Sequence, residues 1–323
     1  MRSPSQPPGL AVVIGAALTL LLGLHPVTPS QASSAAPPPP TVLTSFLPIH
    51  SLTLAIAGKQ VNVENWLPPG VDPHDFQFSP RDLRRLRNAS LLITGGLGLE
   101  GWTESKLQNL SGNPSLRLVE AAQGLPTEAL IQEPCGHDHE HDRDSEPAHH
   151  HAPNPHFWLD PILMSHAATN ILRALQSAFP QSAEDFARNA TNAVAALSRL
   201  HADFSRDLAD AKTPFITYHN AFPYLARRYN LRLVGVVESG ATDQPSARQL
   251  SDLGNLVRNE KARVLFMDGE PPRLARRLSS DLRLKLASLE TLETGELGLD
   301  AYENGMRRNL RTLKEVLRGE PNP

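Results

Sequence analysis

Short β-rich runs alternate with longer helical patterns from residue 41 onward, and this alternation is the feature that most limits the possible folds. Strands separated by helices are typical of α/β units whose sheets are mostly parallel. The sequence therefore predicts an α/β fold with strands and helices in both halves of the chain. The β-rich runs are residues 41–46, 61–67, 91–94, 214–218, 231–237 and 262–267.

One long helical pattern lies between the two halves. From Gln181 to Ala211 the apolar residues recur at steps of three and four positions, which places them on one face of a helix. At about 1.5 Å per residue, such a helix would extend roughly 45 Å, long enough to run along two lobes. We therefore predict an amino-terminal α/β lobe at 41–180, a connecting helix at 181–211 and a carboxy-terminal α/β lobe at 212–323.

Residues 1–32 have the features of a secretory signal peptide. Arg2 provides the positive start, residues 9–24 form an apolar run, and Ser30-Gln31-Ala32 is a small-x-small cleavage site. The alternative is an uncleaved amino-terminal anchor. Residues 33–40, "SSAAPPPP", predict a stiff Pro-rich spacer after the cleavage site. No cysteine stands at the cleavage point, so we expect an exported protein without a lipoprotein anchor.

Charge and cysteine content exclude further possibilities. The formal net charge of the 323-residue chain is -3, which offers no electrostatic basis for binding nucleic acid or an anionic membrane. Cys135 is the only cysteine, so no intramolecular disulfide can form. Its thiol could serve as a soft metal ligand or a dimerising group, or it could have no role.

Three histidines occupy loop positions suited to a ligand site. His74 follows the run 61–67, His219 directly follows the run 214–218, and His156 lies in the short turn "NPHFWLDP". In open α/β sheets, ligands bind at the carboxyl ends of strands. Three imidazoles with one carboxylate or water suit Zn²⁺, whereas a site built for Mn²⁺ should have more oxygen ligands. The alternative for each histidine is a solvated loop position.

Other histidines and two acidic residues also come into consideration. Asp268 closes the run 262–267, and Glu270 lies two residues further. His166 and His201 lie within helical patterns, where a surface position or an ordinary hydrogen bond is expected. For His50 we favour a structural role.

At this point the chain resembles a known family, the zinc and manganese substrate-binding proteins of bacterial ABC transporters (cluster A-I), and in particular its ZnuA-like group. Residues 41–102, from "TVLTSF" to "GLEGW", resemble the amino-terminal lobe of that family. "NPHFWLDP" looks like its second ligand motif and "TYHNAFPYLARRYNL" like its third. The resemblance weakens after about Ala262. It implies two α/β lobes joined by one long helix, with a single metal ion in the cleft between the lobes.

The resemblance also implies a ligand set. Carried over to this sequence, the ligands are His74, His156 and His219, and a histidine at the third position favours Zn²⁺ over Mn²⁺. The fourth ligand of the family, when used, is an acidic residue just after a strand end, and Asp268 in "FMD" matches that register. The continuation "GEPP" departs from the family, so Glu270 or water in place of Asp268 stays open.

A histidine- and acid-rich tract at 135–151, "CGHDHEHDRDSEPAHHH", corresponds to an insertion that zinc-type members often carry between the first and second ligands. It lacks large hydrophobic residues and is expected to be disordered without metal. Binding an ion there must order part of the loop, which weakens binding. We expect accessory weak metal sites formed by His137, His139, His141, His149, His150 and His151.

The resemblance implies a function as well. It implies a monomeric periplasmic binding protein, not an enzyme, that captures Zn²⁺ and delivers it to a membrane permease whose cytoplasmic ATPase supplies the energy. A Mn²⁺-binding member of the family and a periplasmic zinc buffer or chaperone are alternatives. A secreted zinc hydrolase is a remote one, because three histidines with an open fourth position also describe catalytic zinc, although the sequence has no HExxH motif.

Overall fold

The structure is a computed structural model that describes residue 9 and residues 41–132, 153–238 and 245–318. The predicted signal peptide (apart from residue 9), the Pro-rich spacer and the histidine-rich tract with Cys135 lie outside the described residues. Residues 39–323 form one compact unit, and the following description concerns that unit. Among the helices of the described residues, none combines the length and the apolar character needed to cross a membrane.

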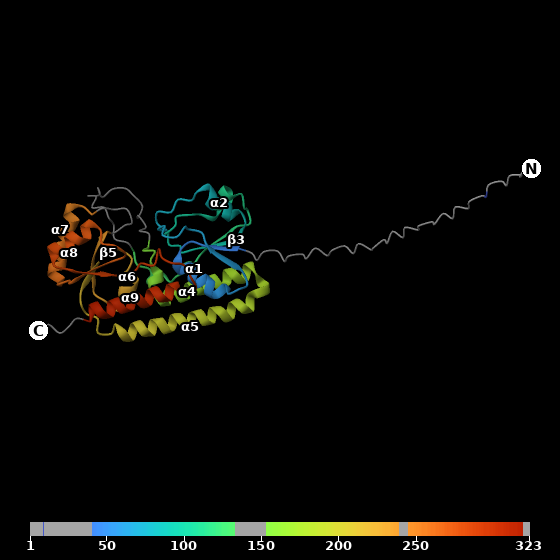
Figure 1. Ribbon diagram of the computed structural model, residues 1–323. Coiled ribbons are helices and arrows are strands. Elements are labelled where there is room, and N and C mark those ends of the chain that lie inside the picture. The colour runs from blue at the N-terminus through green and yellow to red at the C-terminus, as the bar shows by residue number, and fades with distance from the viewer. Residues whose placement is uncertain (1–8, 10–40, 133–152, 239–244, 319–323) are drawn as a thin grey trace, which may run out of the picture. The chain divides into compact units, whose positions relative to one another are not determined.

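The described strands form two four-stranded sheets, and every strand pair in them is parallel (Figure 1). The strand order is β2-β1-β3-β4 in the first sheet and β6-β5-β7-β8 in the second. The predicted α/β class with two lobes is therefore confirmed. The strands are β1 (Thr41–Thr44), β2 (Asn62–Asn65), β3 (Ala89–Thr94), β4 (Arg117–Glu120), β5 (Phe215–His219), β6 (Leu233–Glu238), β7 (Val264–Met267) and β8 (Lys285–Ser288).

Helices follow the strands in both lobes. In Figure 1, α1, α4, α5 and α9 lie together below the two sheets, and α7 and α8 lie at the outer side of the second sheet. The helices are α1 (Leu47–Ala57), α2 (Pro80–Arg87), α3 (Glu104–Ser111), α4 (Pro161–Ala178), α5 (Ala183–Asp207), α6 (Pro223–Arg228), α7 (Ala247–Glu260), α8 (Arg273–Leu282) and α9 (Ala301–Leu317). Short 3₁₀ turns occupy Thr127–Ala129, Phe157–Leu159 and Pro180–Ser182.

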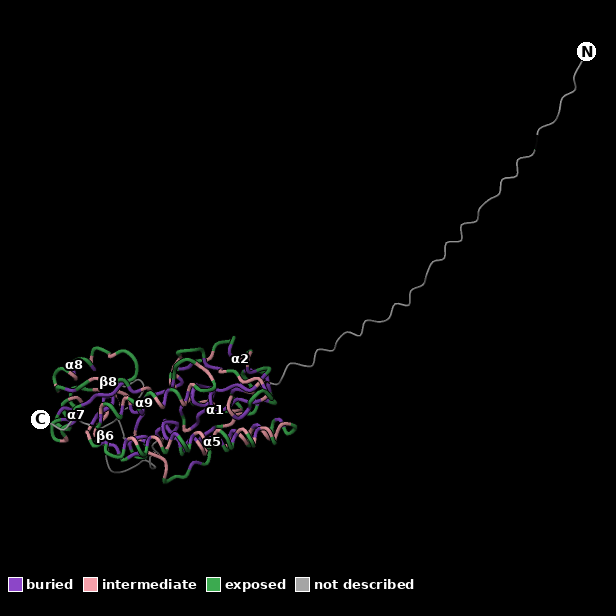
Figure 2. The backbone as a smooth tube through the Cα atoms, turned by 60° about the horizontal axis from the view of Figure 1, so that its bottom comes forward, coloured by how far each residue is buried: buried purple, intermediate pink, exposed green. Residues whose placement is uncertain are grey.

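The long helix α5 begins two residues after the predicted start at Gln181 and ends four residues before Ala211. Its buried face contains Phe186, Leu197 and Phe204, as the spacing predicted. Figure 2 shows this buried stripe along a helix whose other side is exposed. One hydrophobic cluster joins the buried residues of α5 to core residues of both sheets, so α5 packs against the two lobes at once.

The connection between β8 and α9 also links the two lobes. After β8 in the second sheet, the chain reaches α1 in the first lobe, where Ser51 Oγ donates a hydrogen bond to the backbone oxygen of Gly298 at 2.7 Å. Helix α9 then packs against both α1 and α5. The lobes are therefore held together by α5, by α9 and by the segment that precedes α9.

Gly305 in α9 provides a test of this packing. A Cβ atom added there would overlap the side chain of Leu292, whereas a Cβ at Gly254 in α7 would meet no atom closer than 3.5 Å. We expect Gly305→Ala to lower the free energy of unfolding by about 1–3 kcal/mol through overpacking. Gly254→Ala should raise it by roughly 0.5–1 kcal/mol, because alanine is the better helix former. Urea unfolding of the metal-free proteins measures the free energy of unfolding of both variants. A stabilising Gly305→Ala would contradict the close packing of α9 against Leu292.

Candidate metal centre

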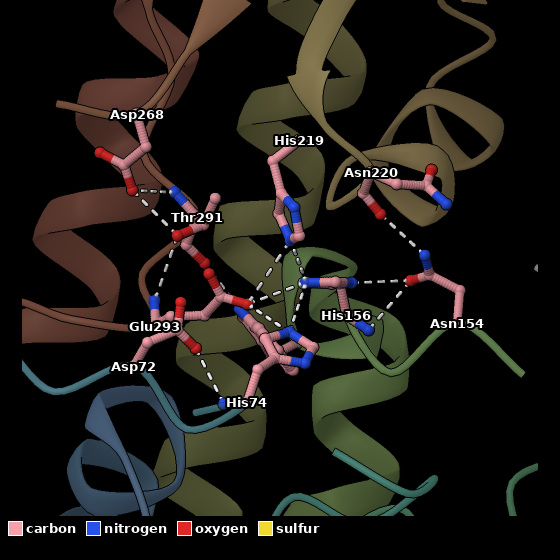
Figure 3. Close-up of polar contacts among 10 residues, drawn as sticks. Asp72, His74, Asn154, His156, His219, Asn220, Asp268, Thr291 and Glu293 are labelled. Carbon is pink, nitrogen blue, oxygen red and sulfur yellow. Dashed lines mark hydrogen bonds and ion pairs between the residues drawn. The ribbon is translucent and has the colours of Figure 1, made fainter. Parts of the chain in front are cut away.

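Four side chains from distant parts of the chain meet at one point between the two lobes (Figure 3). His74 lies in the loop between β2 and α2, His156 precedes the turn that leads into α4, and His219 is the last residue of β5. Glu293 lies in the segment between β8 and α9. One potential ligand atom from each side chain lies within 4.8 Å of all the others.

The carboxylate of Glu293 is the centre of this cluster. Its Oε1 atom lies 2.8 Å from His156 Nε2, 3.0 Å from His74 Nε2 and 3.9 Å from His219 Nε2. The histidines also approach one another, with 3.0 Å between the Nε2 atoms of His219 and His156. Three imidazole nitrogens and one carboxylate oxygen at such spacing can coordinate one four-coordinate ion such as Zn²⁺.

Contacts within the loops hold the backbone at His74 and the imidazole of His156. Asp72 Oδ1 accepts a hydrogen bond from the backbone N–H of His74 at 2.8 Å. Asn154 Oδ1 lies 3.0 Å from both the backbone nitrogen and the Nδ1 atom of His156. Asn154 is itself held, since its Nδ2 donates to the backbone oxygen of Asn220 at 2.7 Å. The contact at Nδ1 orients the ring of His156 so that its Nε2 atom faces Glu293 and His219.

The protonation states suit a metal centre. Burial, together with the neighbouring His156, lowers the pKa of His219 to about 4, so its imidazole is neutral above that pH. Burial acts to raise the pKa of Glu293, but hydrogen bonds from His156 and His74 outweigh it and hold that pKa well below the usual range. Metal ions bind neutral imidazole and ionised carboxylate, which are the forms favoured at His219 and Glu293.

The fourth member of the cluster differs from the sequence-based expectation. Asp268 does not belong to it, because Asp268 Oδ2 accepts hydrogen bonds from the backbone nitrogen and Oγ1 of Thr291 at 2.8 and 2.9 Å. Glu270 is exposed and also lies outside the cluster. The carboxylate that lies beside the three histidines is that of Glu293. The signal that could have found it is an acidic residue shortly after a strand end, but β8 was not among the predicted strands.

The other histidines of the described residues make local contacts. His50 is buried in α1, with Nδ1 2.9 Å from Thr44 Oγ1. His166 Nε2 lies 3.1 Å from the backbone oxygen of Gln123, and His201 Nδ1 lies 3.3 Å from Tyr229 Oη. These contacts agree with the structural and surface roles expected for them. The six histidines of the tract, His137, His139, His141, His149, His150 and His151, lie outside the described residues.

A cavity of about 360 Å³ borders one side of the cluster. His219 and Glu293 contribute to its wall, and three further carboxylates line it, those of Asp72, Glu238 and Asp268. An acidic wall attracts cations. These three carboxylates lie beside the cluster and are not members of it.

Comparison with known proteins identifies the class of protein. Residues 42–316 match the family described as "Zinc-uptake complex component A periplasmic". The chain belongs to this family, which confirms the resemblance seen in the sequence.

Relatives extend over most of this chain. The "Zinc-binding protein AdcA" of Streptococcus pyogenes serotype M6 (strain ATCC BAA-946 / MGAS10394) is 29% identical over 289 residues, which cover 84% of this chain but 55% of the relative. The chain therefore spans about half the length of such relatives. A protein of Treponema pallidum (strain Nichols) named for metal binding is 30% identical over 275 residues, covering 84% of this chain and 85% of that protein.

Solved structures share the fold. The substrate-binding protein FpvC of Pseudomonas aeruginosa, in complex with Ni²⁺, superposes with a TM-score of 0.75 at 23% identity and covers 88% of this chain and 100% of its own. Zn(II)-bound AdcA of Streptococcus pneumoniae gives a TM-score of 0.68 at 24% identity, covering 87% of this chain and 58% of its own. At these identities the similarity establishes the two-lobed fold alone.

The low pKa of His219 gives a prediction for the metal-free protein. The unfolded chain takes up a proton at a histidine near pH 6.5, whereas folded His219 does so near pH 4. The unfolded state then binds more protons between these values, so the free energy of unfolding should fall as the pH is lowered from 6.5 toward 4. Burial gives His50 a pKa of about 4 as well, and it adds to the same loss. Each group contributes at most about 1.4 kcal/mol per pH unit.

Urea unfolding between pH 6.5 and 4 measures the free energy of unfolding. NMR of the imidazole nitrogens measures the pKa of His219 itself, and the His219→Gln variant assigns its resonance. An inflection for His219 near pH 6.5 in the metal-free protein would show that its side chain is solvated and not held in the cluster.

Proposed function

We propose that this protein is the periplasmic zinc-binding component of an ABC-type zinc import system, and that His74, His156, His219 and Glu293 hold the ion. The observation that carries this proposal is the convergence of three imidazole nitrogens and one carboxylate oxygen within 4.8 Å. A set of three nitrogens and one oxygen suits tetrahedral Zn²⁺ better than Mn²⁺, which prefers more oxygen ligands. The names of the AdcA relatives, which refer to zinc binding, support the same metal.

Capture and delivery fit the cluster better than catalysis does. A catalytic zinc ion keeps one coordination position for water or substrate, whereas here four protein groups are available to fill a tetrahedral shell. Glu293, the acidic group nearest the histidines, lies close enough to be a ligand itself. The remote hydrolase alternative would need it as a general base acting on a metal-bound water.

The proposed location and partners come from the family. Its description as a periplasmic component of a zinc-uptake complex supports an exported protein that works with a membrane permease and a cytoplasmic ATPase. The predicted signal peptide at residues 1–32 supports the same location. A zinc buffer or chaperone would use the same ligands, and genes for a permease and an ATPase beside this one would favour the transporter.

Removing one ligand should abolish tight binding. We expect His74→Ala and His156→Ala to weaken Zn²⁺ binding by more than roughly 100-fold, because contacts outside the coordination sphere alone contribute about 10–100-fold. His166→Ala is the matched control, because its imidazole contacts the backbone oxygen of Gln123 and is not a member of the cluster. Competition with a chromophoric chelator measures the Zn²⁺ affinity, and Mn²⁺ is titrated in parallel. Parental affinity of His74→Ala would disprove the ligand set, and tighter binding of Mn²⁺ than Zn²⁺ would favour the manganese alternative.

The histidine-rich tract should contribute weak sites only. It supplies six histidines on a stretch without large hydrophobic residues, and ordering such a stretch opposes binding, whereas the four-residue cluster is already assembled. Calorimetric titration with Zn²⁺ should show one tight site in both the parent and a variant lacking residues 137–151, and additional weak sites in the parent alone. Loss of the tight site on deletion would contradict this division.

A further inference from the structure

We propose that Asp268 is a positioning residue for metal binding: it holds Thr291 so that the turn after Thr291 directs the carboxylate of Glu293 onto the three histidines. This inference rests on the proposed role of Glu293 as a zinc ligand. It gives Asp268 a function that differs from direct coordination.

Thr291 is fixed through each of its backbone and side-chain polar groups. Its backbone nitrogen and Oγ1 both donate to Asp268 Oδ2, at 2.8 and 2.9 Å (Figure 3). Its backbone oxygen accepts a hydrogen bond from Trp158 Nε1 at 2.8 Å. The Oγ1 atom also accepts from the backbone nitrogen of Glu293 at 3.4 Å. Thr291 is thus held from the second sheet by Asp268 and from the His156 loop by Trp158.

The conformation of Leu292, the next residue, explains why Thr291 must be fixed. Leu292 has a φ of 63°, in the left-handed region that a leucine side chain disfavours. Its side chain is 1% exposed and lies where any side chain at Gly305 would be. The chain therefore turns sharply at an unfavourable position. Contacts on either side must maintain that turn, and the Asp268 bonds to Thr291 lie immediately before it.

The turn determines where the Glu293 carboxylate lies. Glu293 follows Leu292 directly, and its side chain is 6% exposed and enclosed by His74 and His156. A loop without the fixed turn would have to be ordered when the metal binds, and that ordering weakens binding. Asp268 therefore acts on the metal through Thr291 and Leu292, without touching the ion.

Glu238 provides a matched control for the charge of Asp268. Both carboxylates line the same cavity beside His219 and Glu293. Glu238 Oε1 accepts a hydrogen bond from Tyr218 Oη at 2.7 Å, and none of its described contacts involves Thr291. A loss of negative charge from the cavity is common to changes at either position, whereas a loss of the hold on Thr291 follows only from changes at Asp268.

The first experiment compares Zn²⁺ affinity in Asp268→Ala, Asp268→Asn and Glu238→Gln. Contacts outside the coordination sphere typically contribute about 10–100-fold in metal affinity, and the exposed position of Asp268 places it at the low end, roughly tenfold for Asp268→Ala. Asp268→Asn should recover most of this loss, because its amide oxygen can accept both hydrogen bonds from Thr291. Glu238→Gln should bind within about twofold of the parent. Equal losses in all three variants would show an effect of charge and overturn the proposal.

The second experiment tests whether Asp268 acts through Glu293. In a double-mutant cycle, Asp268→Ala should weaken Zn²⁺ binding when it is introduced into the parent. It should have no further effect in the Glu293→Gln variant, because the carboxylate that Asp268 positions is already lost there. Additive effects would overturn the proposal. The d–d absorption of bound Co²⁺ reports the coordination sphere independently, and Asp268→Ala should shift this spectrum toward that of Glu293→Gln.

These variants separate the inference from the proposed function. Parental affinity of Glu293→Gln would refute Glu293 as a ligand, whereas a weakened Glu293→Gln beside an unchanged Asp268→Ala would refute only the positioning role. If Asp268→Ala fails to fold, Thr291→Val and Thr291→Ser replace it. Valine removes the hydroxyl that contacts Asp268 and Glu293, and serine keeps it, so only Thr291→Val should weaken Zn²⁺ binding.

Discussion

Glu293 is a buried carboxylate among three imidazoles, and both lobes contribute side chains that surround it. A buried negative charge is costly unless neighbouring groups stabilise it, and His156 and His74 provide the hydrogen bonds that lower its pKa. Those histidines are positioned in turn by Asn154 and Asp72. The cluster thus joins loops of the first lobe, the end of β5 and the segment before α9, and each of these must be in place for the charge to be tolerated. A divalent cation at the same point would relieve the remaining cost directly.

The sequence was informative where local chemistry and periodicity agree. The apolar stripe of α5 and the strands at the centres of both sheets occur in the structure as predicted. Histidines at strand ends were also a sound guide, because parallel strands bring their carboxyl ends to one edge of a sheet. That rule predicted positions for His74 and His219, and the structure places both in the cluster.

Two edge strands, β4 and β8, could not be predicted in the same way. Each has four residues with exposed ends and a half-buried middle, so neither shows a strong hydrophobic period. Missing β8 had a direct consequence for the site, since the fourth acidic group was sought after β7, the last strand that could be recognised. Asp268 satisfied that search and is in fact bonded to Thr291. Glu293 depends on a turn at Leu292 in a left-handed conformation, and a leucine gives no sequence signal for such a turn.

The segment between β8 and α9 is attached to both lobes. At one end Thr291 is bonded to Asp268 of the second lobe, and at the other Gly298 is bonded to Ser51 of the first. Glu293 lies between these two attachments. A small rotation of one lobe against the other would therefore move the segment between β8 and α9, which carries Glu293. His156 is held separately by Asn154. If Glu293 holds an ion as proposed, a force that separates the lobes would act on this carboxylate through the backbone as well as through its contacts with the histidines.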